Sequence, residues 1–301
     1  MNAVHAYNYT IGARLRVSDE DAADFLQSQF SQELRPFEAG QCTYGLWLDV
    51  KGKVIADSWV LCEGPEAFWV LSEHAIASEL QAKLERHIIA DDVCIEASRA
   101  RSACALIGTD AATLLEACPE PGRFVRTQDG VIFAGRRARQ PSYEVIFETA
   151  AAAAAFAARL HAAGVAATDL AWLQQQRIAA GIPLVPQEIG PTELPGEGGF
   201  EADALSFTKG CFLGQEVVAR MHNLGQARRA LYRVQGEGEV PDCPVLLRTA
   251  GGKSAGELRT AVALDSGWLG VALLKLHHVQ AASPIAAECG DVTVLNPLRV
   301  V

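Results

Sequence analysis

Apolar and polar positions alternate with two different periods along the chain. After Ser18 the apolar residues recur three and four positions apart, which predicts a helix over residues 19–30 with Ser18 as its N-cap and acidic residues in its first turn. The same spacing predicts helices over residues 74–87, 109–118 and 150–163, and a further helix that Asp169 caps and that ends at Gly181. Two-residue alternation bounded by turn residues predicts strands over residues 44–50, 53–62, 67–72, 93–97, 103–107, 131–136 and 142–148. Interleaved helices and strands indicate an α+β region.

The pattern changes near residue 226. Beyond it, short apolar runs alternate with turn residues every 8–12 positions, which suits a small β-barrel or sandwich without long helices within residues 232–301. We therefore expect an α+β region over residues 1–226 and a C-terminal β-barrel over residues 227–301. Residues 182–199 are rich in Pro and Gly and are predicted to be irregular. Loops of this length tend to carry function.

Charge and hydropathy narrow the classes of protein. The 301-residue chain has 36 acidic and 26 basic residues, a formal net charge of -10, which argues against nucleic acid as a direct partner. No stretch approaches the roughly 18 consecutive apolar residues that a membrane span needs, and the first thirty residues lack an apolar run flanked by positive charge. We expect a cytoplasmic protein without a membrane partner.

The eight cysteines are scattered and form no C-x-x-C pair, so we predict no metal site and no disulfide framework. Most lie in apolar runs and are expected to be small core residues. Cys211 is the exception. It lies two positions after Lys209 and ahead of a helix predicted over residues 215–222. An ammonium and a helix N-terminus lower the pKa of a cysteine, which favours a reactive thiolate. The alternative is a buried, inert thiol packed between Gly210 and Phe212.

Three ordered motifs carry a resemblance to a known family. The first is Lys209-Gly210-Cys211-Phe212-Leu213-Gly214-Gln215-Glu216 with Arg220 behind it, which is similar to the K-G-C-[F/Y]-x-G-Q-E signature of YgfZ-type proteins. Upstream, residues 177–183 (RIAAGIP) and residues 195–200 (PGEGGF) resemble two elements of glycine-cleavage T-proteins. The chain is thus identified as a member of the YgfZ branch of the T-protein (aminomethyltransferase) superfamily. The resemblance covers most of the chain but is loose over its first hundred residues.

The resemblance implies a T-protein-like fold, with ferredoxin-like units around a folate site and a barrel beside them. Tetrahydrofolate or a one-carbon derivative is the expected cofactor. A pterin presents an amino group and a ring N–H side by side, which a carboxylate accepts as a pair, and Glu197 is the candidate. Its alternative is a solvated loop glutamate. Arg177 or Arg220 would meet the carboxylates of the folate tail, and Tyr44 would flank the ring, although an aromatic residue in a strand also fits a core.

By resemblance, the function is tetrahydrofolate-dependent support of iron–sulfur cluster assembly or repair, and indirectly of iron–sulfur enzymes, including those that modify tRNA. Its partners would be iron–sulfur client or assembly proteins. Cys211 would be the working thiol and Lys209 would lower its pKa. Gln215 and Glu216, counted with the folate-site residues, would fix the turn.

Two alternatives to this function stay open. A folate-dependent aminomethyl- or methyltransferase is the first, but the tandem acid of true T-proteins is reduced here to Ala56-Asp57, so enzyme activity is left open. A folate-binding module with a purely structural Cys211 is the second.

Two further patterns have simpler explanations than a ligand site. His277-His278 on a predicted strand would point to opposite faces and form a surface pair, not a metal site. Gly251-Gly252-Lys253-Ser254 lacks the first glycine of a phosphate-binding loop and is predicted to be a hairpin turn.

Overall fold

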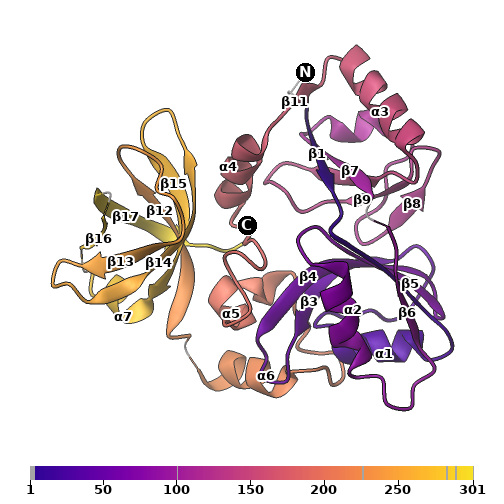
Figure 1. The fold of residues 1–301 in the computed structure, drawn as a ribbon, viewed down its shortest axis with the longest axis horizontal. Coiled ribbons are helices and arrows are strands. Elements are labelled where there is room, and N and C mark those ends of the chain that lie inside the picture. Colours follow the sequence, from indigo (N-terminus) through magenta and orange to yellow (C-terminus); the bar gives the residue numbers. More distant parts are fainter. Residues whose placement is uncertain (1–3, 100, 226, 283, 289, 301) are drawn as a thin grey trace. The chain divides into compact units, whose positions relative to one another are not determined.

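The computed structural model describes residues 4–99, 101–225, 227–282, 284–288 and 290–300 (Figure 1). It divides into two compact units, which we call the sheet unit and the barrel unit. The sheet unit comprises Met1–Leu48, Ala56–Leu170 and Ala204–Leu213. The barrel unit comprises Asp49–Ile55, Ala171–Asp203 and Gly214–Val301. A domain boundary near residue 226 stays a prediction, since this division groups residues 171–203 with the barrel.

The sheet unit contains a six-stranded sheet of order β11-β1-β7-β10-β9-β8. Its strands pair antiparallel apart from β1 with β11, which pair parallel. The strands are β1 (His5–Thr10), β7 (Ser102–Ile107), β8 (Phe124–Arg126), β9 (Val131–Ala134), β10 (Ser142–Ile146) and β11 (Ala166–Ala167). Helix α3 (Ala150–Ala162) begins at Thr149, whose side chain accepts a hydrogen bond from the Ala152 N–H, and it buries Phe156 and Leu160 against this sheet.

A second sheet has five strands in the order β3-β4-β5-β2-β6. They are β2 (Ala13–Ser18), β3 (Cys42–Leu48), β4 (Val54–Gly64), β5 (Ala67–Ser72) and β6 (Cys94–Ala97). Helices α1 (Ala22–Gln29) and α2 (Ala77–Glu85) belong to the same unit. Leu61, Leu71, Phe124 and Phe133 are buried in one apolar cluster to which strands of both sheets contribute.

The barrel unit contains a closed barrel of order β12-β15-β14-β13-β16-β17. The strands are β12 (Arg229–Gly236), β13 (Val245–Thr249), β14 (Ser254–Ala263), β15 (Trp268–Lys275), β16 (Ile285–Ala287) and β17 (Gly290–Pro297). Their alternating inward residues surround Trp268, which is 1% exposed. The predicted barrel is confirmed, and the helix that the structure describes within residues 232–300, α7 (Leu276–Gln280), has five residues. The remaining elements of this unit are α4 (Leu170–Ala180), α5 (Pro195–Gly198), η2 (Phe200–Ala202) and α6 (Gln215–Leu224).

Several local predictions were wrong for identifiable reasons. Ser18 is the last residue of β2, and Asp21 precedes α1 without a side-chain capping bond. The helix predicted over residues 109–118 is reduced to the short 3₁₀ turn η1 (Ala111–Leu114), ahead of Pro119. His277 and His278 lie in α7 rather than in a strand, with ring centroids 3.9 Å apart. The hairpin turn at residues 251–254 is confirmed, with the Thr249 N–H donating to the Lys253 carbonyl.

Candidate functional site

Lys209 is a buried helix cap. Helix α1 ends at Gln29, so its last carbonyls lack partners within the helix. The Lys209 ammonium, 5% exposed, donates to the carbonyls of Gln27 (2.8 Å), Phe30 (2.6 Å) and Gln32 (2.9 Å). A cation at a helix C-terminus also interacts favourably with the helix dipole. The first residue of the K-G-C motif therefore fixes the chain to the end of α1.

This placement changes the expected relation between Lys209 and Cys211. An ammonium has three donors, and all three are used by carbonyls. No donor is left for a direct hydrogen bond to a Cys211 thiolate, so an effect on that thiol would act only through space and stays a prediction. Burial is the main cause that lowers the pKa of Lys209 to about 8. The Glu33 carboxylate opposes this, and the Arg35 guanidinium adds to it.

Cys211 is an exposed free thiol, so the alternative of a buried cysteine in a packing corner is wrong. Its neighbour Phe212 is buried instead, and the centroid of the Phe212 ring lies 5.4 Å from the Lys209 ammonium. The expectation for the other cysteines holds only partly. Three of these thiols are buried, namely Cys42, Cys62 and Cys104. Cys243 is half-buried, and Cys94 and Cys118 are exposed. Cys289 lies outside the described residues.

The second glycine of the K-G-C motif, Gly214, is needed for a close backbone contact. Gly214 is the N-cap of α6 with φ +80°, and a Cβ there would lie 2.6 Å from the Asp49 carbonyl oxygen and 2.8 Å from the Gly52 Cα. Gly52 also has a positive φ of +72°. The turn at residues 49–53 therefore packs directly against the start of α6, which only glycine at position 214 allows. Gln215 is the first residue of α6 and half-buried, and Glu216 is exposed.

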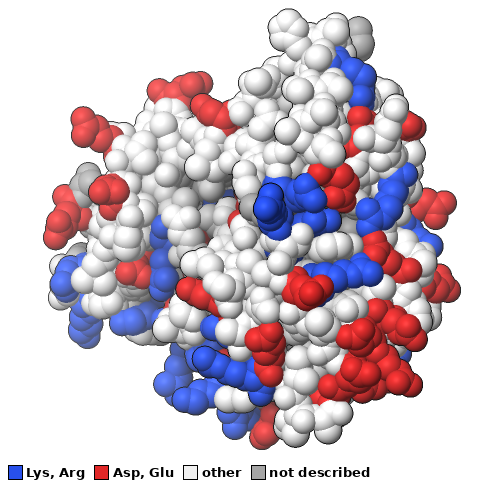
Figure 2. Space-filling view, turned by 45° about the vertical axis from the view of Figure 1, so that its right-hand side comes forward, with Lys and Arg blue, Asp and Glu red and all other residues white. Residues whose placement is uncertain are grey.

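A pocket of about 790 Å³ lies within the barrel unit. Its lining includes two of the predicted folate-site residues, Glu197 and Arg220. It is strongly basic, with five Lys or Arg side chains and one carboxylate. The lining residues are Lys53, Leu194, Glu197, Arg220, Met221, Ala227, Arg228, Arg229, Lys275, Leu276 and His277. Figure 2 shows Lys and Arg side chains gathered at the lower left of the view, although the net charge of the chain is negative.

Glu197 is the acidic group of this pocket and is 7% exposed, so it is not a solvated loop residue. Its Oε2 accepts the Leu194 N–H (2.8 Å), which closes the first turn of α5. Arg229 donates from Nε to Oε1 (2.9 Å) and from Nη2 to Oε2 (3.3 Å). A carboxylate has about four acceptor positions, so Glu197 keeps one. A paired donor on a ligand would need the long Arg229 contact to open.

Four of the six predicted cofactor-binding residues do not line this pocket: Gln215 and Glu216, at the start of α6, and Arg177 and Tyr44. Arg177, 6% exposed, forms a bidentate ion pair with Glu188 (2.7 and 2.9 Å) and does not line the pocket. Tyr44 lies in the sheet unit, where its hydroxyl donates to Asp57 (2.8 Å) and the Arg136 guanidinium stacks 4.6 Å from its ring centroid. Burial raises the pKa of Asp57, and the Tyr44 hydrogen bond opposes this.

The sequence reasoning missed most of the basic pocket residues. Lys53, Arg229 and Lys275 come from three separate segments, so their proximity leaves no local signal. Lys53 donates to the Thr192 carbonyl and Lys275 to the Ser254 carbonyl, which leaves each ammonium with further donors. The run Arg228-Arg229 at the start of β12 was a visible cue.

Among the described residues, no group of three or more His, Cys, Asp or Glu side chains is arranged to hold a metal ion. No described helix combines the length and the apolar character that crossing a bilayer requires.

These observations define the class of protein. The whole chain shares the fold of the glycine cleavage system aminomethyltransferase T from Bartonella henselae, with a TM-score of 0.83, 18% identity, and coverage of 99% of this chain and 87% of that one. The family model of the GCVT N-terminal domain matches residues 1–130, and that of the CAF17 C-terminal beta-barrel domain matches residues 228–298. The protein is thus a T-protein-fold protein with a CAF17-type barrel.

Curated relatives identify the branch within that class. The tRNA-modifying protein YgfZ of Edwardsiella ictaluri is 30% identical over 235 residues, 75% of this chain and 69% of its own. The mitochondrial iron-sulfur cluster assembly factor IBA57 of Mus musculus is 28% identical over 288 residues, 89% of this chain and 76% of its own. The chain belongs to the YgfZ family.

Proposed function

We propose that the chain binds tetrahydrofolate, or a one-carbon derivative of it, in the basic pocket and thereby supports iron–sulfur cluster assembly or repair in the cytoplasm. Iron–sulfur enzymes, including those that modify tRNA, would depend on it indirectly. The relatives of the chain, a tRNA-modifying protein and an iron–sulfur cluster assembly factor, support this role. Client or assembly proteins of iron–sulfur metabolism are the proposed partners.

One observation carries the folate assignment: a single buried carboxylate lies among five cationic side chains. Tetrahydrofolate has the matching distribution of groups, because its pterin donates an adjacent pair of N–H groups and its tail ends in carboxylates. Glu197 would accept from the pterin, and Arg220 would meet the tail. When bound, the cofactor supplies a carrier for one-carbon units. Arg177 is already used by Glu188, so we assign the tail to Arg220, and a role for Tyr44 stays a prediction.

Replacing Glu197 with glutamine should weaken tetrahydrofolate binding by about 1–3 kcal/mol, roughly 5- to 150-fold, because a charged acceptor becomes neutral. Isothermal titration calorimetry measures this directly. Glu201→Gln is the matched control, since Glu201 is an exposed carboxylate in the adjacent η2 that does not line the pocket. Absence of tetrahydrofolate binding by the wild-type protein at millimolar ligand would refute the assignment.

We further propose that Cys211 is the working thiol. The pKa of Cys94, the comparison thiol, is raised by desolvation and by the carboxylates of Glu96, Asp19 and Glu85. Both thiols are exposed, so iodoacetamide should label Cys211 at lower pH than Cys94, as read site by site by mass spectrometry. Burial raises the pKa of Cys104 to about 12, so that thiol should stay unlabelled in the native protein.

A cellular test of the same proposal compares the two cysteines used in the labelling experiment, Cys211 and Cys94. Cys211→Ser should fail to restore iron–sulfur enzyme activity in a deletion strain, whereas Cys94→Ser should restore it. Full restoration by Cys211→Ser would assign Cys211 a structural role. Labelling of Cys211 that is no faster than that of Cys94 would argue against a reactive thiol.

A folate-dependent aminomethyl- or methyltransferase is the second candidate. Asp57 supports it, because a carboxyl group with a pKa raised by burial and held by a tyrosine is suited to proton transfer. Ala56, 5% exposed, counts against it, because an acid precedes the corresponding aspartate in T-proteins. Turnover of an aminomethyl donor with tetrahydrofolate, abolished in Asp57→Asn, would favour the transferase.

A further inference from the structure

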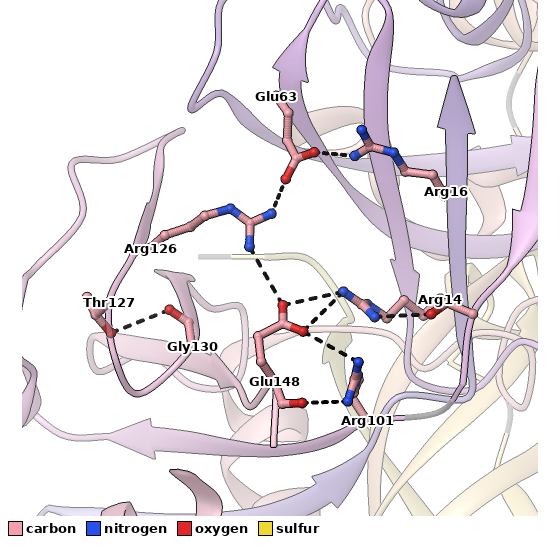
Figure 3. A network of polar contacts seen from close by, with 9 residues as sticks. Arg14, Arg16, Glu63, Arg101, Arg126, Thr127, Gly130 and Glu148 are labelled. Carbon is pink, nitrogen blue, oxygen red and sulfur yellow. Dashed lines mark hydrogen bonds and ion pairs between the residues drawn. The ribbon is translucent and has the colours of Figure 1, made fainter. Parts of the chain in front are cut away.

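A cluster of arginines in the sheet unit is not used by the proposed function. Four guanidiniums and two carboxylates form one network, drawn in Figure 3. The five-stranded sheet contributes Arg14 and Arg16 from β2 and Glu63 from the end of β4. The six-stranded sheet contributes Arg101 just before β7, Arg126 at the end of β8 and Glu148 just after β10. Two positive charges in this network therefore lack a counter-charge.

The two carboxylates are held very differently. Glu63 is bound at close range by Arg16 and Arg126. Glu148 is surrounded by three guanidiniums, and Figure 3 shows them pointing toward its carboxylate. Each of these contacts is long: 3.4 Å from Arg14, 3.6 Å from Arg101 and 3.6 Å from Arg126. Charged hydrogen bonds are normally about 2.7–2.9 Å. One carboxylate tethered to the backbone does not satisfy three guanidiniums.

The burial of these arginines makes the excess charge costly. Arg14 is 7% exposed, and its guanidinium stacks 3.9 Å from the centroid of the Trp69 ring. Burial lowers the pKa of Arg14; Glu148 opposes this, and the guanidiniums of Arg101 and Arg126 lower it further. The Nε of Arg101 is buried and has no hydrogen-bond partner among the described residues. Buried donors of this kind need an acceptor.

The site is nevertheless open to solvent on one side. The side chains of Arg101, Arg126 and Glu148 are 34%, 46% and 38% exposed. Arg126 is the last residue of β8, and the turn that follows it is closed by hydrogen bonds between Thr127 and Gly130. A small ligand can therefore reach Arg101 and Arg126 from solvent, and Arg14 once the Glu148 side chain moves aside, without unfolding either sheet.

We propose that Arg14, Arg101 and Arg126 form a binding site for a phosphate group, which takes the place of the Glu148 carboxylate between them. A phosphate carries a charge of about -1.5 to -2 and presents at least three acceptor oxygens in different directions. It therefore matches both the charge excess and the arrangement of donors, whereas a planar carboxylate with two oxygens matches neither. All residues of this site lie in the sheet unit, and all residues of the basic pocket lie in the barrel unit.

The test is a titration of the full chain with inorganic phosphate, followed by calorimetry and by thermal unfolding, with chloride at the same ionic strength as reference. Saturable binding with a Kd of about 1 mM or tighter is expected. Arg126→Gln should weaken binding at least tenfold. Glu148→Gln should tighten it severalfold, because the carboxylate that competes for the same guanidiniums is removed. A purely structural role of Glu148 would not raise phosphate affinity.

The control is Arg123→Gln, because Arg123 lies just before β8, is similarly exposed and pairs with Glu38 outside the network. It should leave phosphate binding unchanged. Absence of saturable binding, or binding that is the same in Arg126→Gln, would overturn the proposal, and the latter would point to the barrel-unit pocket instead. Ribose 5-phosphate provides a second arm. Tighter binding than that of inorganic phosphate identifies a phosphate ester as the ligand, and weaker binding identifies free phosphate; both support the site.

Discussion

Arg177→Met should lower the free energy of unfolding by about 3–5 kcal/mol, the cost of removing one partner of a buried ion pair. Its partner Glu188 is fully buried and also accepts from the Thr260 hydroxyl (2.7 Å) and the Leu184 N–H (2.8 Å). Without the guanidinium, that carboxylate is an uncompensated buried charge. Arg177 also donates to the Ile182 carbonyl (2.6 Å), so the turn after α4 loses a hydrogen bond as well.

Chemical denaturation measures this effect, and two variants calibrate it. Arg123→Met removes an exposed ion pair and should cost within about 1 kcal/mol. The double variant Arg177→Met/Glu188→Gln should recover part of the loss, because the buried carboxylate is no longer charged. If Arg177→Met unfolds no more easily than Arg123→Met, the Arg177 ion pair does not stabilise the fold. Arg177 would then again be a candidate for binding the carboxylates of the folate tail.

Lys209→Met should lower the free energy of unfolding by about 2–4 kcal/mol, because buried carbonyls lose their donor. The size of the loss should depend on pH. The folded-state pKa of Lys209 is lowered to about 8 from an ordinary value of 10.5, so between these values the unfolded chain binds more protons. The pH-dependent part of the Lys209 contribution to stability therefore rises with pH through this window, is complete above 10.5, and is lost as the pH falls through 8, where the hydrogen bonds to the carbonyls remain.

The check is the difference in unfolding free energy between the wild-type protein and Lys209→Met, measured from pH 7 to pH 10. It should be flat near pH 7 and grow above about pH 8. Lys253→Met is the control, because Lys253 is exposed in the β13–β14 turn, and its difference should stay flat. A Lys209 difference that shrinks with increasing pH would contradict the assigned burial.

Local pattern was enough to predict most elements and the barrel, because strand alternation and turn residues act over a few positions. It failed where a longer-range contact decides the outcome. Ser18 looked like a helix cap, yet it pairs with Ala67 and Cys94 as the end of a central strand. Cys94 looked like a core residue, but β6 is an edge strand whose alternate side chains face solvent.

The candidate site shows the same limit more sharply. Glu197 and Arg220 were reached through motifs, and the pocket contains both. Arg177 was reached in the same way, but Glu188, eleven positions away, uses its guanidinium. The proximity of Lys53 and Lys275 to Glu197 depends on how the turn and the barrel fold, and no sequence period encodes it. Residue type and motif order predicted the chemistry of the site, and tertiary contacts determined which residues take part.

The attachment of Lys209 to the end of α1 has a consequence for the newly made protein. Its three acceptors precede it by 182, 179 and 177 positions. At about 5–20 residues per second, ribosomes need roughly 10–35 s to synthesise the intervening chain. Throughout that interval no ammonium donates to the carbonyls at the end of α1, so this helix emerges long before its C-terminal cap is made. The K-G-C segment therefore closes the sheet unit late in synthesis, and a nascent chain that stops short of it leaves this helix end for a chaperone or a protease.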